Sequence, residues 1–343
     1  MSEPSPVRRR NRASGADIVR MEDVARAAGV SPITVSRALN TPEKLSTETL
    51  RAVRAAAEKL RYVPNLNAGT LASNRSRTIA IIVPTVSHSI FSDTVDGLAQ
   101  ALAPQHYQLL LGQTHYRADE ETALVKAFLG RRVEGMVLTG VNHGRGVRSG
   151  LLRAAIPVVE TWDLSERPIH MVAGFSNHAA GQEAARYLAR RGYSSLAFIG
   201  GSDDRSSARL QGFREGARAS GLGEVAVALV PPPSAPAEAG VALADLLSRG
   251  TPRALFCSND MLAAGAIFEC ARRGIAVPGQ LAVMGFADLP IAVSIEPSLT
   301  TVQVRSTQMG HLAGEMLLHY LRTGSVSKRI ENLGFSVVQR ASA

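Results

Sequence analysis

Two hydrophobic patterns divide the chain near residue 77. Between Met21 and Leu60, alanine and apolar residues recur at the three- and four-residue spacing of amphipathic helices, with no strand pattern among them. From Thr78 onward, short uninterrupted apolar runs alternate with amphipathic stretches of helical length. This change of pattern predicts a small helical domain followed by a much larger α/β domain.

The helical region is punctuated by residues that begin and end helices. Gly29 ends the first predicted helix, and Ser31 followed by Pro32 begins a second one almost at once. A Thr-Pro pair ends the second helix, and Ser46 begins a third. Two short helices joined by a glycine turn, with a third packed behind them, predict a helix-turn-helix.

The larger region contains runs that are apolar along their whole length. These runs are Ile79–Pro84, Tyr107–Gly112, Gly135–Thr139, Pro157–Thr161, Met171–Phe175, Leu196–Gly200, Val225–Val230, Ala254–Ser258 and Leu281–Phe286. Because strands of this kind, separated by helices, are buried on both faces, they predict two doubly wound parallel sheets in a two-lobed α/β core. We expect the late segment Leu299–Arg305 to cross back between the lobes.

Basic charge is concentrated at the amino-terminal end. The whole chain has a formal net charge of +9, and residues 1–75 contribute +6 of it, from 13 Lys and Arg against 7 Asp and Glu. Such clustering is expected of a module that binds a polyanion. The arginines among the first dozen residues would also fit a basic disordered tail, but the patterned helices that follow favour a DNA-binding domain.

Composition and missing motifs argue against several other classes of protein. No apolar run reaches the roughly 18 residues of a membrane span, and no apolar segment follows the basic start as in a secretory signal, so we expect a cytoplasmic, nucleoid-associated protein. Cys257 and Cys270 lie in apolar surroundings and are interpreted as buried small residues. No phosphate-binding loop, nucleophile elbow or metal-ligand spacing occurs, so we expect no catalysis, no cofactor and no metal.

Polar residues follow many of the predicted strands, where open α/β sheets bind their ligands. Carboxylates, amides, an arginine and aromatic residues form a mixture that suits a polyol or a sugar acid. Asn259 fits a helix cap as well as a ligand contact, and Trp162 fits a core residue as well as a stacking surface. The candidate ligand-binding residues are Ser87, His88, Phe91, His115, Asp163, Arg209, Asn259 and Asp288.

The order of motifs along the chain resembles that of the LacI family of bacterial repressors. In the amino-terminal region the matching motifs are Asp23-Val24-Ala25, Ala28-Gly29-Val30-Ser31, Thr34-Val35-Ser36-Arg37, Leu39-Asn40, Tyr62-Val63-Pro64-Asn65, Ala68 and Leu71-Ala72. In the larger region they are Arg209-Leu210-Gln211-Gly212-Phe213, Phe256-Cys257-Ser258-Asn259-Asp260, Gly285-Phe286 and Pro297-Ser298-Leu299-Thr300-Thr301-Val302. The resemblance covers nearly the whole chain and leaves out only the basic tail.

The resemblance implies DNA contacts from the second helix and from the linker that follows the third. The residues implied to face the major groove are Pro32, Ile33, Ser36 and Arg37, and those implied to hold phosphates are Ser31, Thr34 and Asn40. The linker residues are Asn65, Ala68 and Leu71, of which the leucine would wedge into the minor groove at the operator centre. Because this linker is short and contains glycine, we expect it to become helical only on operator DNA, in a dimer.

Within the family, the chain resembles repressors of gluconate uptake and catabolism. The matching runs are Pro157–Glu160 with Asp163, Val172–Phe175, Phe268–Cys270 and Leu333–Phe335. By this resemblance Arg209 would bind an effector carboxylate, while Asp163 and Asn259 would bind hydroxyl groups. Ser176 stands where an Asp usually precedes the Asn in relatives, and Ala287 stands where many relatives carry an acidic or polar residue, although Asp288 follows. Both changes favour an anionic ligand and leave gluconate, a ketogluconate and other aldonates open.

The resemblance also implies a modular organisation. The expected parts are a disordered basic tail 1–17, a helix-turn-helix domain 18–63, a hinge helix or linker 64–76, and an effector-binding, dimerising core 77–343 like that of periplasmic sugar-binding proteins. The first lobe is expected to contain about 77–174 and 303–331, and the second about 175–302 and 332–343.

The expected function is that of a homodimeric transcriptional repressor of a sugar-acid operon. A small effector bound between the lobes would release it from a palindromic operator, although a corepressor response stays open. A sugar-binding transport protein would need a signal peptide and no helix-turn-helix. An enzyme of sugar metabolism with an added DNA-binding domain would need a catalytic motif. Neither alternative fits the sequence as well.

Overall fold

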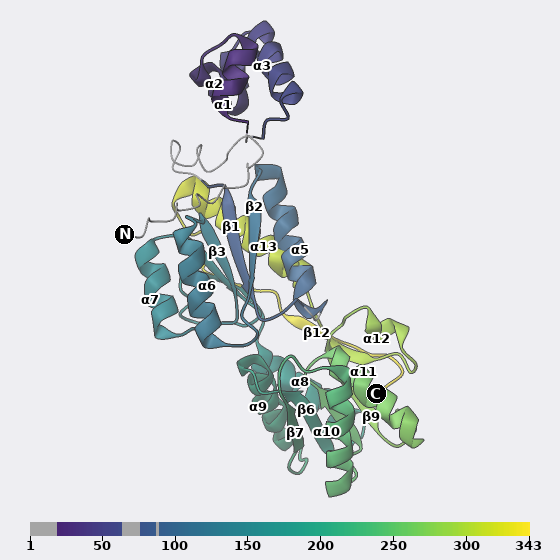
Figure 1. Ribbon diagram of the computed structural model, residues 1–343. Coiled ribbons are helices and arrows are strands. Elements are labelled where there is room, and N and C mark those ends of the chain that lie inside the picture. Colours follow the sequence, from purple (N-terminus) through teal and green to yellow (C-terminus); the bar gives the residue numbers. More distant parts are fainter. Residues whose placement is uncertain (1–18, 64–75, 87–88) are drawn as a thin grey trace, which may run out of the picture. The chain divides into compact units, whose positions relative to one another are not determined.

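The computed structural model describes residues 19–63, 76–86 and 89–343 of the chain. The chain divides into two compact units, residues 1–75 and residues 76–343 (Figure 1). We call residues 19–63 the headpiece and the second unit the core. The change of hydrophobic pattern near residue 77 therefore coincides with the division between the units.

The headpiece is helical, and residues predicted from the sequence set its helix ends. Gly29 adopts a left-handed φ of 67° after the first helix. The Oγ atoms of Ser31 and Ser46 each accept a hydrogen bond at 3.2 Å from the backbone N–H three residues later, which begins the next two helices. The predicted helix-turn-helix is confirmed; its elements are α1 (Met21–Ala28), α2 (Pro32–Asn40), η1 (Pro42–Lys44) and α3 (Thr47–Lys59).

A small apolar core joins these three helices. Val24 of α1, Val35 of α2 and Val53 of α3 are fully buried and belong to one cluster. Because each helix buries only one stripe, its opposite side faces solvent and can carry polar or charged residues without cost to the fold.

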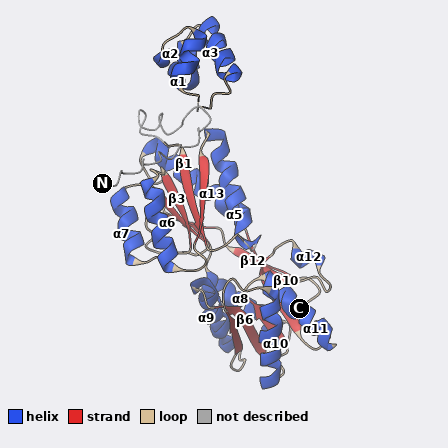
Figure 2. Ribbon diagram, in the orientation of Figure 1, coloured by secondary structure: helices blue, strands red, loops and turns tan. Residues whose placement is uncertain are grey.

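The first sheet of the core has the strand order β11-β5-β4-β3-β1-β2, and its strands are parallel. The sheet and the helices that cover it form lobe 1 (Figure 2). Its strands are β1 (Thr78–Val83), β2 (Gln108–Gln113), β3 (Gly135–Thr139), β4 (Val158–Thr161), β5 (Met171–Gly174) and β11 (Ile330–Asn332).

Helices cover both faces of this sheet, which explains its uninterrupted apolar strands. Ile79 and Ile81 of β1 pack in one cluster with Leu98, whereas Ala80 and Ile82 pack in another with residues of the opposite helices. On the first face lie α5 (Ser92–Leu102) and α13 (Ser306–Thr323), and on the second lie α6 (Ala118–Gly130) and α7 (Arg145–Ala154) (Figure 1). Two short 3₁₀-helices, η2 (Ser89–Phe91) and η3 (Ala103–Gln105), flank α5.

The second sheet has the order β12-β10-β9-β8-β6-β7 and forms lobe 2 with its helices. Its strands are parallel except for β12, which pairs antiparallel with β10. They are β6 (Leu196–Gly201), β7 (Ala226–Val230), β8 (Ala254–Cys257), β9 (Ala282–Ala287), β10 (Thr300–Val304) and β12 (Phe335–Val338). The helices are α8 (Asn177–Arg190), α9 (Asp204–Ala219), α10 (Pro236–Arg249), α11 (Asp260–Arg273) and α12 (Ile291–Ser294).

The chain passes between the lobes after β5, β10 and β11. The expectation that Leu299–Arg305 makes such a crossing is wrong, because most of that segment is β10 inside the second sheet, and the crossing follows it. β11 and β12 lie at sheet edges, are only three and four residues long, and were not predicted. Strands this short carry too little pattern to be distinguished from loops.

Helices α8 and α9 pack unusually close together, and glycines make this possible. A Cβ on Gly181 of α8 would lie 2.0 Å from the carbonyl oxygen of Arg209, and a Cβ on Gly212 of α9 would lie 1.9 Å from that of His178. The close approach fixes where α9 lies in lobe 2. No helix in the part of the chain that the structure describes is long and apolar enough to cross a membrane.

Candidate effector-binding site and DNA-facing helix

Helix α2 has its predicted major-groove residues exposed or half-buried, while Val35 and Ala38 face the core of the headpiece. Arg37 is exposed and long enough to reach a base edge or a phosphate. Ile33 has 65% of its surface exposed, so it is available for apolar contact with a thymine methyl group. The exposed predicted residues are Ser31, Pro32, Ile33 and Arg37, and the half-buried ones are Thr34 and Ser36.

Several predicted residues lie outside the described part of the chain. Asn40 ends α2, but its side chain is not described. The others that fall outside are Asn65, Ala68, Leu71, Ser87 and His88.

Two adjoining cavities lie at the carboxyl ends of the core strands, where residues of both lobes meet. The inner cavity has a volume of about 20 Å³ and the outer one about 350 Å³, and they share Tyr116, Asp203 and Arg205. The inner lining includes Phe91, Tyr116, Trp162, Arg205, Arg209 and Asn259. The outer lining includes Thr114, Tyr116, Arg117, Asn142, Asp203 and Arg205.

The guanidinium of Arg209 is the most deeply buried charge of the inner cavity. Arg209 is 5% exposed, donates a hydrogen bond from Nη1 to Asn177 Oδ1, and lies 4.2 Å from the ring centroid of Phe286. Burial lowers its pKa to about 10, against an opposing effect of the Asp203 carboxylate, so it stays protonated at neutral pH. Its Nε has no hydrogen-bond partner among the described residues. Such a group is suited to bind an anion.

Asn177 is held so that its oxygen faces Arg209. Ser176 begins α8 by accepting a hydrogen bond from Ala179 N at 3.1 Å, and Asn177 is the first residue of the helix. Its Nδ2 donates to the Trp162 carbonyl oxygen at 2.7 Å, which leaves Oδ1 as the acceptor for the guanidinium. Trp162 is itself fully buried and donates from Nε1 to Thr94, so it is a core residue that also lines the inner cavity.

Two helices of lobe 2 begin at the inner cavity. Asn259 Oδ1 accepts from Leu262 N at 2.8 Å and begins α11, while Asp203 Oδ1 accepts from Ser206 N at 3.3 Å and begins α9. Asn259 is therefore a helix cap and a cavity residue at once. Helix N-termini carry a partial positive charge, which adds to the preference of the cavity for an anion.

Arg205 and Tyr116 bring the two lobes together at the cavity. Arg205 lies one helical turn before Arg209, with its guanidinium 5.4 Å from the ring centroid of Phe91 and 3.6 Å from Asp203 Oδ1. Tyr116 faces this guanidinium from lobe 1. Burial raises the pKa of Tyr116, with Arg205 acting in the opposite direction, so its hydroxyl stays protonated and can donate a hydrogen bond.

Three predicted effector residues do not line either cavity. His115 is exposed. Asp163 Oδ1 accepts from the backbone N–H groups of Leu164 and Asn177. Asp288 forms an ion pair with Arg340 at 2.7 Å and accepts from Gln303, so its carboxylate is already engaged.

The candidate set also left out residues that line the cavities. Tyr116 follows His115 directly, and both adopt a positive φ, so the sequence could not show which of the two faces inward. Ser234 lies in a loop after β7, without a local signal. Arg205 lies in the segment Asp203–Arg209, which follows a predicted strand, and residues four apart share a helix face, so the choice of Arg209 also indicates Arg205.

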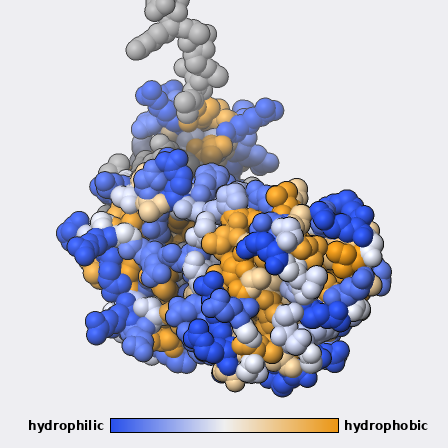
Figure 3. Space-filling model, turned by 90° about the horizontal axis from the view of Figure 1, so that it is seen from below, coloured by the Kyte–Doolittle hydropathy of each residue, from blue (hydrophilic) through white to orange (hydrophobic). Residues whose placement is uncertain are grey.

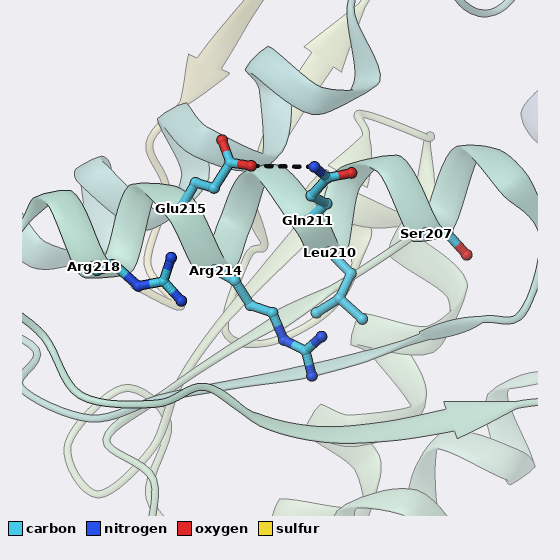
Figure 4. Close-up of a pocket in the computed structure, with 6 residues that line it drawn as sticks. All are labelled: Ser207, Leu210, Gln211, Arg214, Glu215 and Arg218. Carbon is cyan, nitrogen blue, oxygen red and sulfur yellow. Dashed lines mark hydrogen bonds between the residues drawn. The ribbon is translucent and has the colours of Figure 1, made fainter.

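A separate groove runs along the outer side of α9 (Figure 4). Gln211 and Glu215 rise on one side of the helix and share a hydrogen bond of 3.2 Å, whereas Leu210 and Arg214 lie on the other. Its volume is about 330 Å³, but none of the predicted effector residues lines it. The inner cavity, with its buried guanidinium, is the better candidate site.

Known proteins match both units of this chain. Residues 20–65 match the model of bacterial regulatory proteins of the LacI family, and residues 185–343 match that of a periplasmic binding protein-like domain. The HTH-type transcriptional regulator GntR of Pseudomonas aeruginosa is 36% identical over 325 residues, which cover 94% of this chain and 95% of that protein. The chain therefore belongs to the LacI family of bacterial regulatory proteins.

Solved structures support the same assignment. A LacI family transcriptional regulator from Silicibacter pomeroyi superposes with a TM-score of 0.88 at 31% identity, over 94% of this chain and 99% of that one. The transcription regulator GntR from Chromobacterium violaceum gives a TM-score of 0.74 at 34% identity, over 77% and 98%. The predicted fold class, a helix-turn-helix headpiece with a two-lobed α/β core, is confirmed. The chain is a DNA-binding transcriptional repressor of this family, and these relatives are regulators rather than enzymes.

Proposed function

We propose that this repressor binds a palindromic operator as a homodimer and is released by a sugar acid, gluconate or another aldonate, in the inner cavity. The observation that carries the choice of ligand is the buried guanidinium of Arg209, whose Nε lacks a hydrogen-bond partner in the described residues. A buried cation is stable only when hydrogen bonds and an opposite charge compensate it. An aldonate carboxylate supplies both.

The remaining polar groups of the cavity suit the hydroxyl groups of such a ligand. Asn259, Ser234 and Ser258 line it without net charge, and the Tyr116 hydroxyl is protonated. In this proposal they replace His115 and Asp288 as ligand contacts, and Asp163 acts on the ligand only through the electrostatic field at Arg209. The similarity to regulators named GntR agrees with the resemblance of the sequence to gluconate repressors.

The DNA-binding part of the proposal rests on the surface of α2. Its major-groove residues are proposed to be Pro32, Ile33, Ser36 and Arg37, and its phosphate contacts Ser31, Thr34 and Asn40. Asn65, Ala68 and Leu71 are proposed to complete the interface from the linker 64–76, after the DNA-binding domain 18–63.

Dimerisation is proposed to involve the core. Figure 3 shows apolar side chains gathered on the face of the core turned toward the viewer. The exposed large apolar side chains of lobe 2 include Val241 of α10, with 75% of its surface exposed, and Phe268 of α11. Covering such residues in a second copy would join two chains, and the two half-sites of a palindromic operator require two headpieces.

The release mechanism is proposed to be a population shift. The ligand bonds to residues of both lobes, so it favours one arrangement of the lobes over another. A coupling of roughly 1–3 kcal/mol per ligand would lower operator affinity severalfold or more.

Operator binding measured by fluorescence anisotropy during titration with sugar acids tests this proposal. The duplex is selected by the wild-type protein from random DNA. Gluconate or a ketogluconate should weaken binding, whereas uncharged glucose should not. Arg209→Gln should abolish the response, and Arg214→Gln, an exposed residue of the same helix, should preserve it. A response to no aldonate would rule out this ligand class, and tighter operator binding would identify a corepressor.

A further inference from the structure

Arg205 is a residue of lobe 2 whose contacts lie largely in lobe 1. Its Nη1 donates to the carbonyl oxygen of Thr139, at the end of β3, over a long 3.5 Å. The same guanidinium packs on the ring of Phe91 and faces Tyr116, both in lobe 1. A Cβ on Gly140 would lie 3.3 Å from Nη1, so a glycine at this position leaves room for the arginine.

Arg209, one turn further along the same helix, behaves differently. Its partners Asn177 and Phe286 both belong to lobe 2. Two guanidinium groups therefore line one small cavity from one helix, but only that of Arg205 connects the lobes. A ligand that displaces Arg205 changes a contact between the lobes directly, whereas a ligand on Arg209 reaches lobe 1 only through Asn177 and its bond to the Trp162 carbonyl oxygen.

The charges of the inner cavity leave one positive charge without a matching anion. Its lining contains two guanidinium groups, Arg205 and Arg209, against one carboxylate, Asp203. Asp203 is also engaged in beginning α9. Two like charges this close repel each other, so a carboxylate placed between them would be favoured by both.

The volume of the inner cavity shows that something must move to admit such a ligand. About 20 Å³ accommodates little more than one water molecule. The outer cavity next to it is far larger, and Arg205 lines both. Asp203 and Tyr116 line both cavities too, but Asp203 begins α9, and Tyr116 is a shorter, more rigid side chain hydrogen-bonded to Arg205 itself. Arg205 is the long side chain whose displacement would join the cavities.

We propose that Arg205 is an inter-lobe gate, which exchanges its contacts with Thr139 and Phe91 for the carboxylate of the effector and so couples ligand binding to lobe movement. The ligand class rests on the proposed function. The bridge, by which we mean the contacts of Arg205 with Thr139 and Phe91 of lobe 1, does not. Arg209 then supplies affinity, and Arg205 converts binding into a change of operator affinity. Arg205 is a positioning residue for the response as well as a ligand contact.

The bridge can be tested without any ligand by measuring the distance between the lobes. Spin labels are placed at Leu152→Cys on α7 and Ala219→Cys on α9, both exposed positions, while the native Cys257 and Cys270 are buried. In Arg205→Gln the distance distribution measured by electron double resonance should broaden or shift relative to the parent. An unchanged distribution would overturn the bridge.

Arg214→Gln is the matched control for the distance measurement and for the binding measurements. Arg214 is an exposed residue of the same helix as Arg205, and it lines the separate groove on α9 rather than either cavity. Its replacement removes a cation of α9 that belongs to neither cavity. It should leave the distance distribution and the response to gluconate as in the parent; a change as large as that in Arg205→Gln would overturn the assignment.

The coupling is tested by measuring gluconate affinity and operator affinity on the same variants. Arg205→Gln should bind gluconate roughly tenfold more weakly, as expected for the loss of one charge-assisted hydrogen bond. Saturating gluconate should then change its operator affinity by less than about twofold. Arg205→Lys, which keeps the charge but cannot hold both lobes, should bind gluconate more tightly than Arg205→Gln and still respond poorly. A wild-type response in either variant would overturn the gate.

The two proposals fail in distinguishable ways. If the parent protein ignores every aldonate, the ligand class fails, and the distance measurement alone decides the bridge. If the parent responds and Arg205→Gln responds equally, the gate fails and the ligand class stands. Thermal unfolding of each variant shows whether a lost response results only from loss of the folded state.

Discussion

The headpiece and the core place their functional residues by opposite means. In the headpiece, Ser31 and Ser46 begin helices through bonds to residues three positions away, and the exposed side of α2 follows from its own sequence. In the core, Arg209 meets Asn177 across 32 positions and Arg205 meets Thr139 across 66. The proposed DNA-contacting surface of α2 is therefore a property of one helix, whereas the cavity exists only when both lobes are correctly packed.

The largest difference between the two units should be in the stability lost when a glycine is replaced by alanine. Gly181→Ala is the change in the core. The new Cβ would overlap the backbone of α9, and overpacking of this kind should lower the free energy of unfolding of the core by about 3 kcal/mol. Gly29→Ala is the matched change in the headpiece, where nothing lies within 4 Å and only the φ of 67° is strained, so about 1 kcal/mol is expected. Chemical denaturation followed separately for each unit checks the pair; equal losses would contradict the comparison.

The two units should also differ in their dependence on pH. In the headpiece, the ion pair between Arg26 and Asp23 is largely exposed and contributes little. In the core, His143 is buried, with Nδ1 2.7 Å from Glu121 Oε1 and Nε2 3.4 Å from Glu160 Oε1. Burial lowers the pKa of His143, but the two carboxylates outweigh it and raise the pKa to about 9.

A raised folded-state pKa sets the sign and the pH window of the effect. The stabilisation from His143 is fully present below its ordinary pKa of 6.5 and is lost as the pH rises through about 9. The difference corresponds to about 3 kcal/mol in the free energy of unfolding of the core. His143→Gln should remove this slope, as measured by denaturation at several pH values between 6 and 10. The same slope in the variant would assign the effect to other groups.

Arg37→Ala should affect operator binding without affecting the core. We expect a loss of about 1–3 kcal/mol in operator affinity and relaxed preference at one base pair if Arg37 contacts a base. Anisotropy measurements on the selected duplex and on single-base variants distinguish the cases. Uniform weakening across all sequences would identify a phosphate contact instead. The affinity of the core for gluconate should stay unchanged, because the two units are separate.

Ser31→Ala should have the smallest effect of the four predictions made here for the two units. Loss of the bond to Thr34 N should destabilise the headpiece by about 1 kcal/mol. Circular dichroism during thermal unfolding of the full-length chain measures it, with Ser31→Asp, which can still begin the helix, as the control. Equal destabilisation by both changes would show that the side chain acts in another way.

The sequence alone determined those features whose signals are local. Helix ends in the headpiece depend on single residues such as Gly29, and the strands of the core are long apolar runs, so their places and the fold class followed from pattern. Arg209 and Asn259 were found because they follow strands whose ends meet at one edge of a sheet.

The tertiary structure decided everything that depends on partners distant in the sequence. Asp288 was expected to face the ligand, but Arg340 engages it, and the sequence cannot show that pairing. The Leu299–Arg305 segment was expected to cross between lobes, but hydrogen bonds to β9 and β12 make it a strand. Whether Arg205 points to solvent or to Thr139 depends on how the two lobes meet. The sequence determines which side chain stands at each position, but the partner of that side chain depends on the packing of elements far apart along the chain.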